Sequence, residues 1–98
     1  MVLIKVLIVD DQELIRLGVQ SLLEEVSGLE VTCFLAASGE EALAQYKALS
    51  PDIIFLDINM PGIGGIETAR KILKAETTAK IIVLSVLDDG PIPAYLVQ

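Results

Sequence analysis

The chain has 98 residues, 53% of them hydrophobic and 21% charged, and its 14 acidic and 7 basic residues give a net charge of −7. This length fits one domain, and this apolar content excludes a disordered chain. The negative charge argues against binding a nucleic-acid backbone. Every apolar run is far shorter than the ~18 residues of a membrane span. One cysteine and no histidine exclude an intrachain disulfide and a cysteine-based zinc site. With no signal peptide in the sequence, we expect a small cytoplasmic protein that binds neither membranes nor nucleic acid.

The first third of the chain alternates a strand pattern with a helix pattern. Val2–Val9 is an almost unbroken apolar run, typical of a strand buried on both faces. Gln12–Val26 has apolar residues at helical spacing, and Gly28 after it is a common helix stop. Glu30–Ala36 is rich in β-branched and aromatic residues and predicts a second strand. The residues expected on the buried face of the first helix are Ile15, Val19, Leu22, Leu23 and Val26.

A second helix and a third strand follow. Ser38 and Glu41 have the spacing of a capping box, which predicts that a helix begins here. Ser50-Pro51 ends this helix, because a residue before proline avoids helical backbone angles. Ile53–Leu56 then predicts a third buried strand that runs into Asp57. The residues expected on the buried face of the second helix are Ala42, Leu43, Tyr46 and Leu49.

The last third begins with a glycine-rich segment. Met60–Gly65 contains three glycines and a proline and predicts a loop with glycine at positive φ. A third helix is expected at about Ile66–Ala75 and a fourth buried strand at Lys80–Ser85. Pro91 or Pro93 suits the first turn of a last short helix. The residues expected on the buried face of the third helix are Ile66, Ala69, Ile72 and Leu73.

Regular alternation of strands and helices predicts an α/β fold with a parallel sheet and helices on both faces. In such sheets ligands bind at the carboxyl ends of the strands, where Asp10, Asp11, Asp57 and Ser85 stand. Taken singly, each of these residues has an ordinary structural explanation, so only their joint placement indicates a site. Three adjacent carboxylates raise one another's pKa unless a cation intervenes, and an oxygen-only ligand set with open positions suits Mg²⁺.

Three motifs resemble the receiver domain of bacterial two-component response regulators. They are Val9–Asp11, Leu56–Gly62 and Val83–Ser85, and the resemblance extends over essentially the whole chain. The most specific feature is Asn59, two residues after Asp57 and directly before Met-Pro-Gly. The resemblance implies one receiver domain at residues 1–98, with the flavodoxin-like (CheY-like) doubly wound parallel sheet.

Other short segments narrow the resemblance. Gln12–Arg16, Pro61–Gly65 and Pro91–Ala94 are similar to the GacA/UvrY/LetA-type regulators. The full chains of that group carry a LuxR-type helix-turn-helix output domain. The resemblance therefore implies control of transcription by an intact regulator, through a DNA-binding domain that these 98 residues lack.

The resemblance also implies a role for each residue at the carboxyl edge. Asp57 would accept a phosphoryl group from the phosphohistidine of a sensor histidine kinase or histidine phosphotransfer domain. Asp11 would bind Mg²⁺ directly, Asp10 largely through water, and Asn59 through its backbone carbonyl. Ser85 would hydrogen-bond the new phosphoryl oxygen and report its arrival. Such a domain is a phosphoacceptor with at most self-dephosphorylation, rather than an enzyme.

The sequence departs from the receiver pattern near its end. Receivers have a fifth strand, which ends in a lysine that pairs with the phosphoryl group, and a fifth helix. No lysine follows Lys80 in this chain. The resemblance thus implies a receiver truncated after about four βα units. An uncovered strand edge pairs readily with another chain, so we expect marginal stability or self-association through Lys80–Ser85 or the fourth helix.

Two other functional classes stay open at this point. A phosphohydrolase of the haloacid-dehalogenase type also uses an aspartate nucleophile and Mg²⁺ at a strand end. That class needs a second aspartate two residues later as general acid, and Asn59 stands there instead. The second alternative is an interaction fragment that no longer phosphorylates and only docks a kinase or another partner. The absent lysine favours this alternative, whereas the three intact aspartates argue against it.

Overall fold

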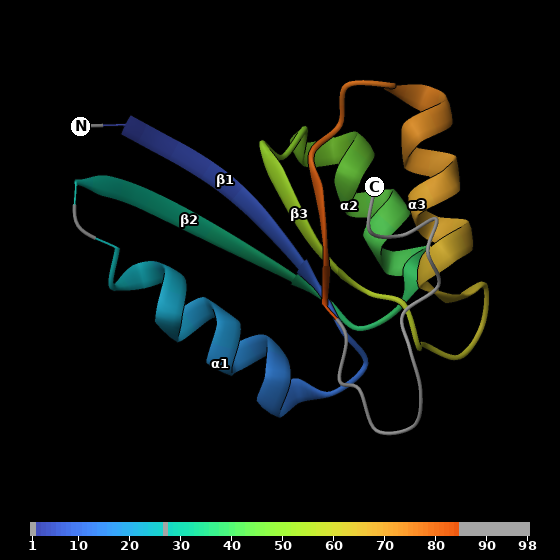
Figure 1. The fold of residues 1–98 in the computed structure, drawn as a ribbon, viewed down its shortest axis with the longest axis horizontal. Helices are drawn as coiled ribbons and strands as arrows, with labels where there is room; N and C mark the ends of the chain where they lie inside the picture. The colour runs from blue at the N-terminus through green and yellow to red at the C-terminus, as the bar shows by residue number, and fades with distance from the viewer. Residues whose placement is uncertain (1, 27, 85–98) are drawn as a thin grey trace.

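Four strands and three helices alternate in the computed structural model, which describes residues 2–26 and 28–84 (Figure 1). The strands form one parallel sheet in the order β2-β1-β3-β4, which confirms the predicted α/β fold. Among the described residues, no helix has the length and apolar content to span a membrane. The elements are β1 (Val2–Val9), α1 (Glu13–Glu24), β2 (Leu29–Ala36), α2 (Gly39–Leu49), β3 (Ile53–Asp57), α3 (Gly64–Ala75) and β4 (Ile81–Leu84).

Strand β1 is the centre of the sheet because it pairs with β2 on one side and β3 on the other. Its almost unbroken apolar sequence suits this position, and its second half, Val6–Val9, is at most 2% exposed. The chain first passes from β1 to β2 and later crosses to β3 on the opposite side of β1. The order of the strands therefore reverses between β1 and β3, which is where ligands bind in sheets of this kind.

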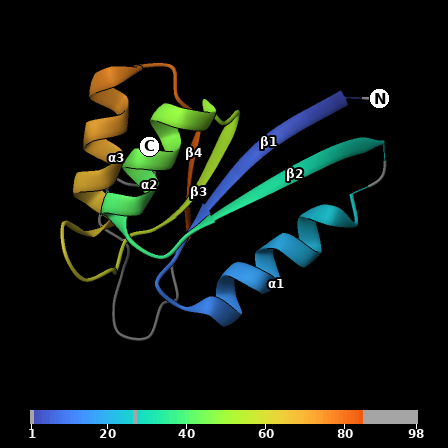
Figure 2. The ribbon, with the colours of Figure 1, turned by 180° about the vertical axis from the view of Figure 1, so that it is seen from behind.

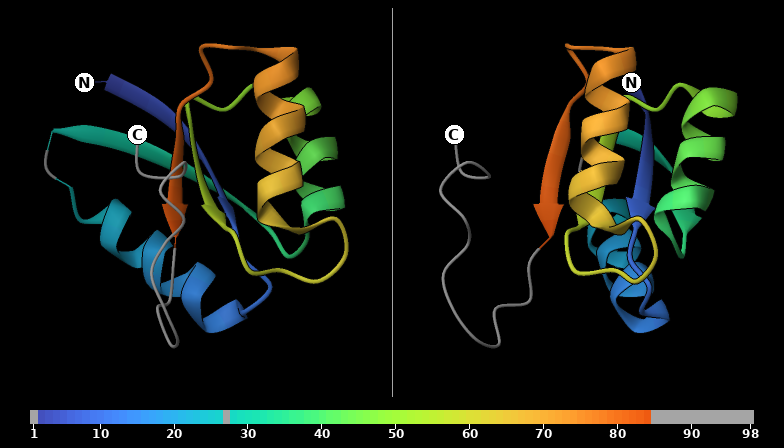
Figure 3. Two further views of the ribbon diagram at one scale, coloured as in Figure 1. Left: turned by 45° about the vertical axis from the view of Figure 1, so that its right-hand side comes forward. Right: turned by 90° about the vertical axis from the view of Figure 1, so that its right-hand side faces the viewer.

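Helices α2 and α3 lie side by side on one face of the sheet, as both views in Figure 3 show. Their apolar sides pack with alternate residues of β1 and β3 into the core. Leu73 was expected to point inward but is 40% exposed. It lines an apolar hollow of about 220 Å³ on the β4 side of α3, together with Leu56, Ala69 and Val83, and no described helix covers that side. The buried core residues are Leu7, Val9, Ala36, Ala42, Ile54, Leu56, Met60 and Ile72.

Helix α1 is the only described helix on the opposite face (Figure 2). It packs against β1 and β2, and none of its residues is fully buried. Leu22 and Val26 were expected on the buried face, but they are 69% and 43% exposed. The prediction is wrong for these two residues, of which Val26 lies beyond the end of α1, whereas Ile15, Val19 and Leu23 are half-buried as expected.

Local sequence signals fix most element ends. The Ser38 hydroxyl accepts a hydrogen bond from the Glu41 backbone N–H at 3.1 Å, which confirms the predicted N-cap of α2. Ser50 ends that helix in the left-handed conformation, with φ of 47°. Gly62 has φ of 79°, as predicted for the loop before α3. Helix α3 begins at Gly64, two residues before the expected start, and the predicted helix near Pro91 lies outside the described residues.

Candidate functional site

The sheet brings three aspartates together at its carboxyl edge. Val9 of β1 is the partner of Leu56 of β3, so Asp10, just after β1, and Asp57, the last residue of β3, lie side by side. Carboxylate oxygens of Asp10, Asp11 and Asp57 all lie within 4.8 Å of one another. Asp10 is 3% exposed and Asp57 8% exposed, whereas Asp11 is exposed to solvent. The predicted convergence of these three residues is therefore correct.

Hydrogen bonds hold Asp10 at the junction of β1 and α1. Its backbone N–H donates to the Ala36 carbonyl at 3.1 Å, which continues the pairing with β2 by one residue. Its carboxylate accepts from the Gln12 N–H at 2.8 Å, and its carbonyl accepts from the Arg16 guanidinium at 2.7 Å. Both the backbone and the side chain of Asp10 are thus tied to the first turn of α1.

Asp57 is held by the loop that follows it. Its carboxylate accepts a hydrogen bond from the Asn59 N–H at 2.9 Å. Met60, which follows Asn59, is buried in the core and so fixes the loop against the rest of the domain. Asp57 thus belongs to a rigid strand end, while its carboxylate still lies within reach of the two aspartates that follow β1.

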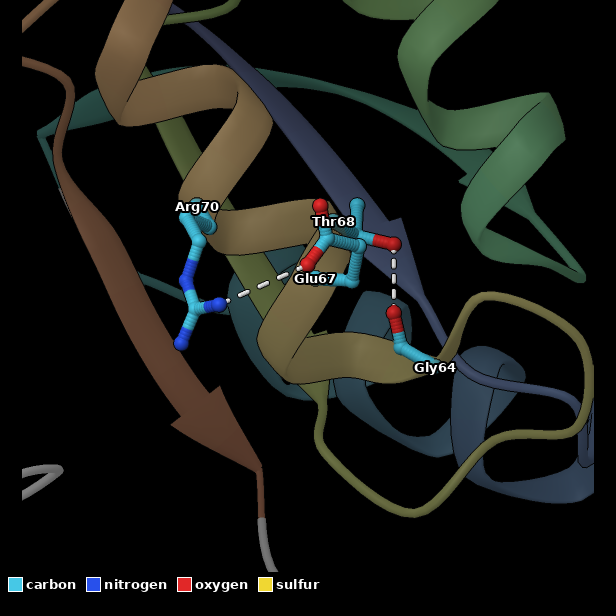
Figure 4. Close-up of polar contacts among 4 residues, drawn as sticks. All are labelled: Gly64, Glu67, Thr68 and Arg70. Atoms are coloured by element: carbon cyan, nitrogen blue, oxygen red, sulfur yellow. Dashed lines mark hydrogen bonds and ion pairs between the residues drawn. The ribbon is translucent and has the colours of Figure 1, made fainter.

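The start of α3 packs directly on the backbone of Asp57. A Cβ at Gly65 would overlap the carbonyl oxygen of Asp57 and lie 2.5 Å from the Ile58 Cα, so only glycine fits. One turn on, the buried Thr68 hydroxyl donates to the Gly64 carbonyl at 2.7 Å, while Glu67 and Arg70 lie 3.7 Å apart on the outer side (Figure 4). This first turn supports the strand end that carries the carboxylate.

The electrostatics of the cluster penalise its negative charge. Burial raises the pKa of the Asp10 carboxyl group, and the charges of Asp57 and Asp11 raise it further, against the opposing hydrogen bond from Gln12. Burial also raises the pKa of Asp57, and the charge of Asp11 adds to this effect. The site therefore disfavours the ionised forms of Asp10 and Asp57.

This donor set fits a hard divalent cation. The ligand oxygens of an octahedral Mg²⁺ lie about 3–4 Å apart, and the carboxylate oxygens of the three aspartates all lie within 4.8 Å of one another. A cation would also offset the repulsion that raises the two pKa values. Asp10, Asp11 and Asp57 are the residues that would hold it.

A family comparison connects this geometry with known proteins. Residues 6–95 match the family model described as "Response regulator receiver domain". The chain belongs to this family. The resemblance found in the motifs is therefore confirmed over residues 6–95.

Relatives of known name give the same result. The chain is 42% identical over 96 residues to "Response regulator GacA" of Pseudomonas syringae pv. syringae, and 41% identical over 96 residues to "Response regulator UvrY" of Escherichia coli strain K12. Each alignment covers 98% of this chain and 44% of the relative. The chain thus spans less than half the length of these regulators.

Solved structures agree with the fold. The response regulator TrrA of Thermotoga maritima, in complex with Mg²⁺-BeF, has a TM-score of 0.72 and 42% identity over 81% of this chain and 66% of its own. A LuxR-family response regulator of Aurantimonas has a TM-score of 0.73 and 35% identity over 82% of this chain and 56% of its own. The flavodoxin-like, CheY-like architecture is therefore confirmed.

The structure adds residues that the sequence interpretation missed. Arg16, Gly65 and Thr68 support the two strand ends through a hydrogen bond to Asp10, close packing on Asp57 and a hydrogen bond within α3, respectively. Gly65 belonged to a loop in the prediction, and only the early start of α3 shows why it is glycine. No pattern in the sequence indicated that Arg16 donates a hydrogen bond to the Asp10 carbonyl. Ser85 lies outside the described residues, so its role stays a prediction.

Proposed function

We propose that residues 1–98 are the receiver domain of a response regulator and that Asp57 is the phosphoacceptor. The observation that carries the proposal is the placement of a largely buried Asp57 carboxylate at the end of β3, within 4.8 Å of oxygens of Asp10 and Asp11. A carboxylate oxygen of Asp57 attacks the phosphorus of a kinase phosphohistidine, the P–N bond breaks, and the histidine leaves. The product is an aspartyl-phosphate.

The other residues of the site assist this transfer. Asp10, Asp11 and Asp57, with the backbone carbonyl of Asn59, would hold Mg²⁺, which when bound neutralises charge on the phosphoryl oxygens. The Asn59 N–H orients the Asp57 carboxylate, and the Gln12 N–H does the same for Asp10. Ser85 is proposed to donate to the phosphoryl oxygen. The domain acts as a switch with at most self-dephosphorylation.

Partners and setting follow from the family. We propose that a sensor histidine kinase or histidine phosphotransfer domain supplies the phosphoryl group in the cytoplasm. Relatives named GacA and UvrY are more than twice as long as this chain. We propose that the additional part of an intact regulator is a LuxR-type DNA-binding output. The 98 residues themselves would bind neither DNA nor membranes. Transcription is then regulated through the phosphorylation state of Asp57.

The proposal is tested by intact mass after incubation with acetyl phosphate and Mg²⁺. We expect a single phosphoryl adduct that is lost in Asp57→Asn and in the presence of EDTA. Asp52→Asn is the matched control, because Asp52 is an exposed carboxylate before the start of β3, at the opposite edge of the sheet. An adduct would show that the site works without a lysine after β4. No adduct on the parent chain would favour the interaction fragment instead.

Self-association is a second, separable part of the proposal. Among the described residues, β4 pairs only with β3, and Ile82 in its middle is 46% exposed. An open strand edge next to an exposed apolar side chain favours pairing with a second copy. Sedimentation at increasing concentration should show a dimer that Ile82→Lys weakens. A monomer at all concentrations would remove self-association through the fourth strand from the proposal.

A further inference from the structure

A second hollow lies between α2 and α3, away from the aspartate cluster. It has a volume of about 300 Å³. Its lining comes from the carboxyl-terminal parts of both helices, whereas Asp57 adjoins the first turn of α3. Figure 3 shows the two helices side by side, with these ends at the edge of the sheet opposite the site. The lining residues are Leu43, Tyr46, Lys47, Lys71, Ile72 and Ala75.

Side-chain size explains why the hollow forms there. At the start of α2, Gly39 lets Thr68 of α3 approach so closely that a Cβ at Gly39 would overlap the threonine hydroxyl. Farther along, Leu43 and Tyr46 face α3, and Ala75 is too small to fill the space opposite them. The floor is apolar, with Ile72 only 1% exposed.

Two lysines stand at this hollow, and both are exposed. Within the described residues, neither Lys47 nor Lys71 forms an ion pair with a carboxylate. Compensation of the helix dipole accounts for a lysine in a last turn, as at Lys47, but not for Lys71, which lies before the last turn of α3. The hollow thus has a buried apolar floor and, beside it, two exposed lysines that pair with no described carboxylate.

Two nearby carboxylates, those of Glu76 and Asp52, keep their negative charge but accept hydrogen bonds from other groups and pair with neither Lys47 nor Lys71. Glu76, just after α3, accepts a hydrogen bond from the Tyr46 hydroxyl. Asp52 accepts from the backbone N–H of Lys5 at 2.8 Å. The acidic residues of α2 and α3 themselves lie in the first turns, toward the aspartate cluster. The lysine-bearing ends of the two helices thus contrast with a chain whose net charge is −7.

We propose that this hollow docks an acidic segment of a partner protein. One apolar side chain of the partner would enter between α2 and α3, and carboxylates on either side of it would pair with Lys47 and Lys71. An anionic membrane is a poorer match, because the hollow is concave and the net charge of −7 would be repelled by an extended negative surface. This surface is separate from the phosphoacceptor site and does not depend on it.

The experiment uses a synthetic helical peptide with a phenylalanine flanked one turn before and after by glutamates, titrated into the ¹⁵N-labelled chain. We expect chemical-shift changes at Leu43, Lys47, Lys71 and Ala75. Lys47→Gln/Lys71→Gln should weaken binding about three- to tenfold, as two exposed ion pairs allow. Peptides with alanine for phenylalanine or lysine for glutamate should lose binding.

The matched control is Lys74→Gln/Lys80→Gln, which removes the same charge from lysines that do not line the hollow. Circular dichroism confirms that both double variants remain folded. Equal weakening by the two double variants, or shifts outside α2 and α3, would overturn the proposal in favour of a general charge effect. Binding to anionic phospholipid vesicles but not to the peptide would also overturn it. Asp57→Asn should leave peptide binding unchanged.

Discussion

The two faces of the sheet differ in how completely helices cover them. On one face, α2 and α3 bury alternate residues of β1 and β3, such as Leu7 and Ile54. On the other, α1 contacts β1 and β2, and the strands farther along leave Ile82 of β4 46% exposed. Side chains alternate between faces along a strand, so the same apolar sequence supplies both surfaces. Both faces of the central strand β1 are buried, so the difference between the faces appears at β4, which α1 does not cover.

The two faces of the sheet also hold the aspartates of the site in different ways. Asp10 and Asp57 lie at the carboxyl ends of β1 and β3, whose side chains pack in the core under α2 and α3. Met60, in the loop after Asp57, also packs in this core. The less covered face contributes α1, whose first turn holds Asp10 through Gln12 and Arg16. The core under α2 and α3 thus fixes the strands that carry the site, and hydrogen bonds from α1 on the other face hold Asp10.

Two leucine truncations should give the largest contrast between the faces. Leu7→Ala removes a side chain that is 0% exposed in β1 and should lower the free energy of unfolding by about 2–5 kcal/mol. Leu14→Ala removes one that is 81% exposed in α1 and should cost less than about 0.5 kcal/mol. Urea denaturation measures both. A large loss for Leu14→Ala would mean that α1 is covered in solution by another chain.

Two glycine substitutions should give a smaller contrast of opposite signs. Gly65→Ala forces a methyl group into the backbone of Asp57 and should destabilise by about 1–3 kcal/mol. Gly18→Ala in α1 meets nothing within 4 Å and should stabilise by about 0.5–1 kcal/mol, because alanine is the better helix former. Thermal melts of both variants provide the measurement. Equal effects would show that α3 does not press on β3 as described.

Much of this fold could be predicted because strand and helix patterns are local properties. The unbroken run at Val2–Val9 and the cap at Ser38 gave correct elements. The inward faces were less predictable, since Leu22 and Leu73 are apolar at helical spacing but lie where no described helix covers them. The start of α3 was placed late because glycines at its first turn resemble a loop until their packing is seen.

The candidate site was predictable for a different reason. Parallel strands end at one edge, so Asp10, Asp11 and Asp57 had to converge once the alternation was correct. What could not be predicted were the groups that hold them, because a contact such as Arg16 to the Asp10 carbonyl depends on the angle at which α1 leaves β1. A charged residue at the end of a strand can be recognised in a sequence, whereas the contacts that hold it in place depend on how the helices pack against the sheet.

The smallest expected effect concerns the aspartate cluster at the carboxyl edge of the sheet. In the metal-free protein, Asp57→Asn should raise the free energy of unfolding at neutral pH slightly, because it removes a buried charge and its repulsion with Asp11. Asparagine keeps an oxygen that accepts from the Asn59 N–H, so the loop stays fastened. Asp52→Asn, at an exposed position, is the control and should change little.

The pH dependence gives this prediction its sign. Asp57 has a raised pKa in the folded state, so the folded protein holds a proton on it more tightly than the unfolded chain does. The parent chain should therefore lose stability as the pH rises from the ordinary aspartate pKa through the raised value, and Asp57→Asn should lose less over the same range. Urea titrations in EDTA between about pH 4 and 7 measure this difference.

Added Mg²⁺ should make the parent chain the more stable of the two, since ligand binding to the folded state stabilises the parent chain more than a variant that has lost one carboxylate. If Asp57→Asn is instead the less stable protein in EDTA, the three carboxylates are not a strained cluster awaiting a cation, and the magnesium site would have to be abandoned.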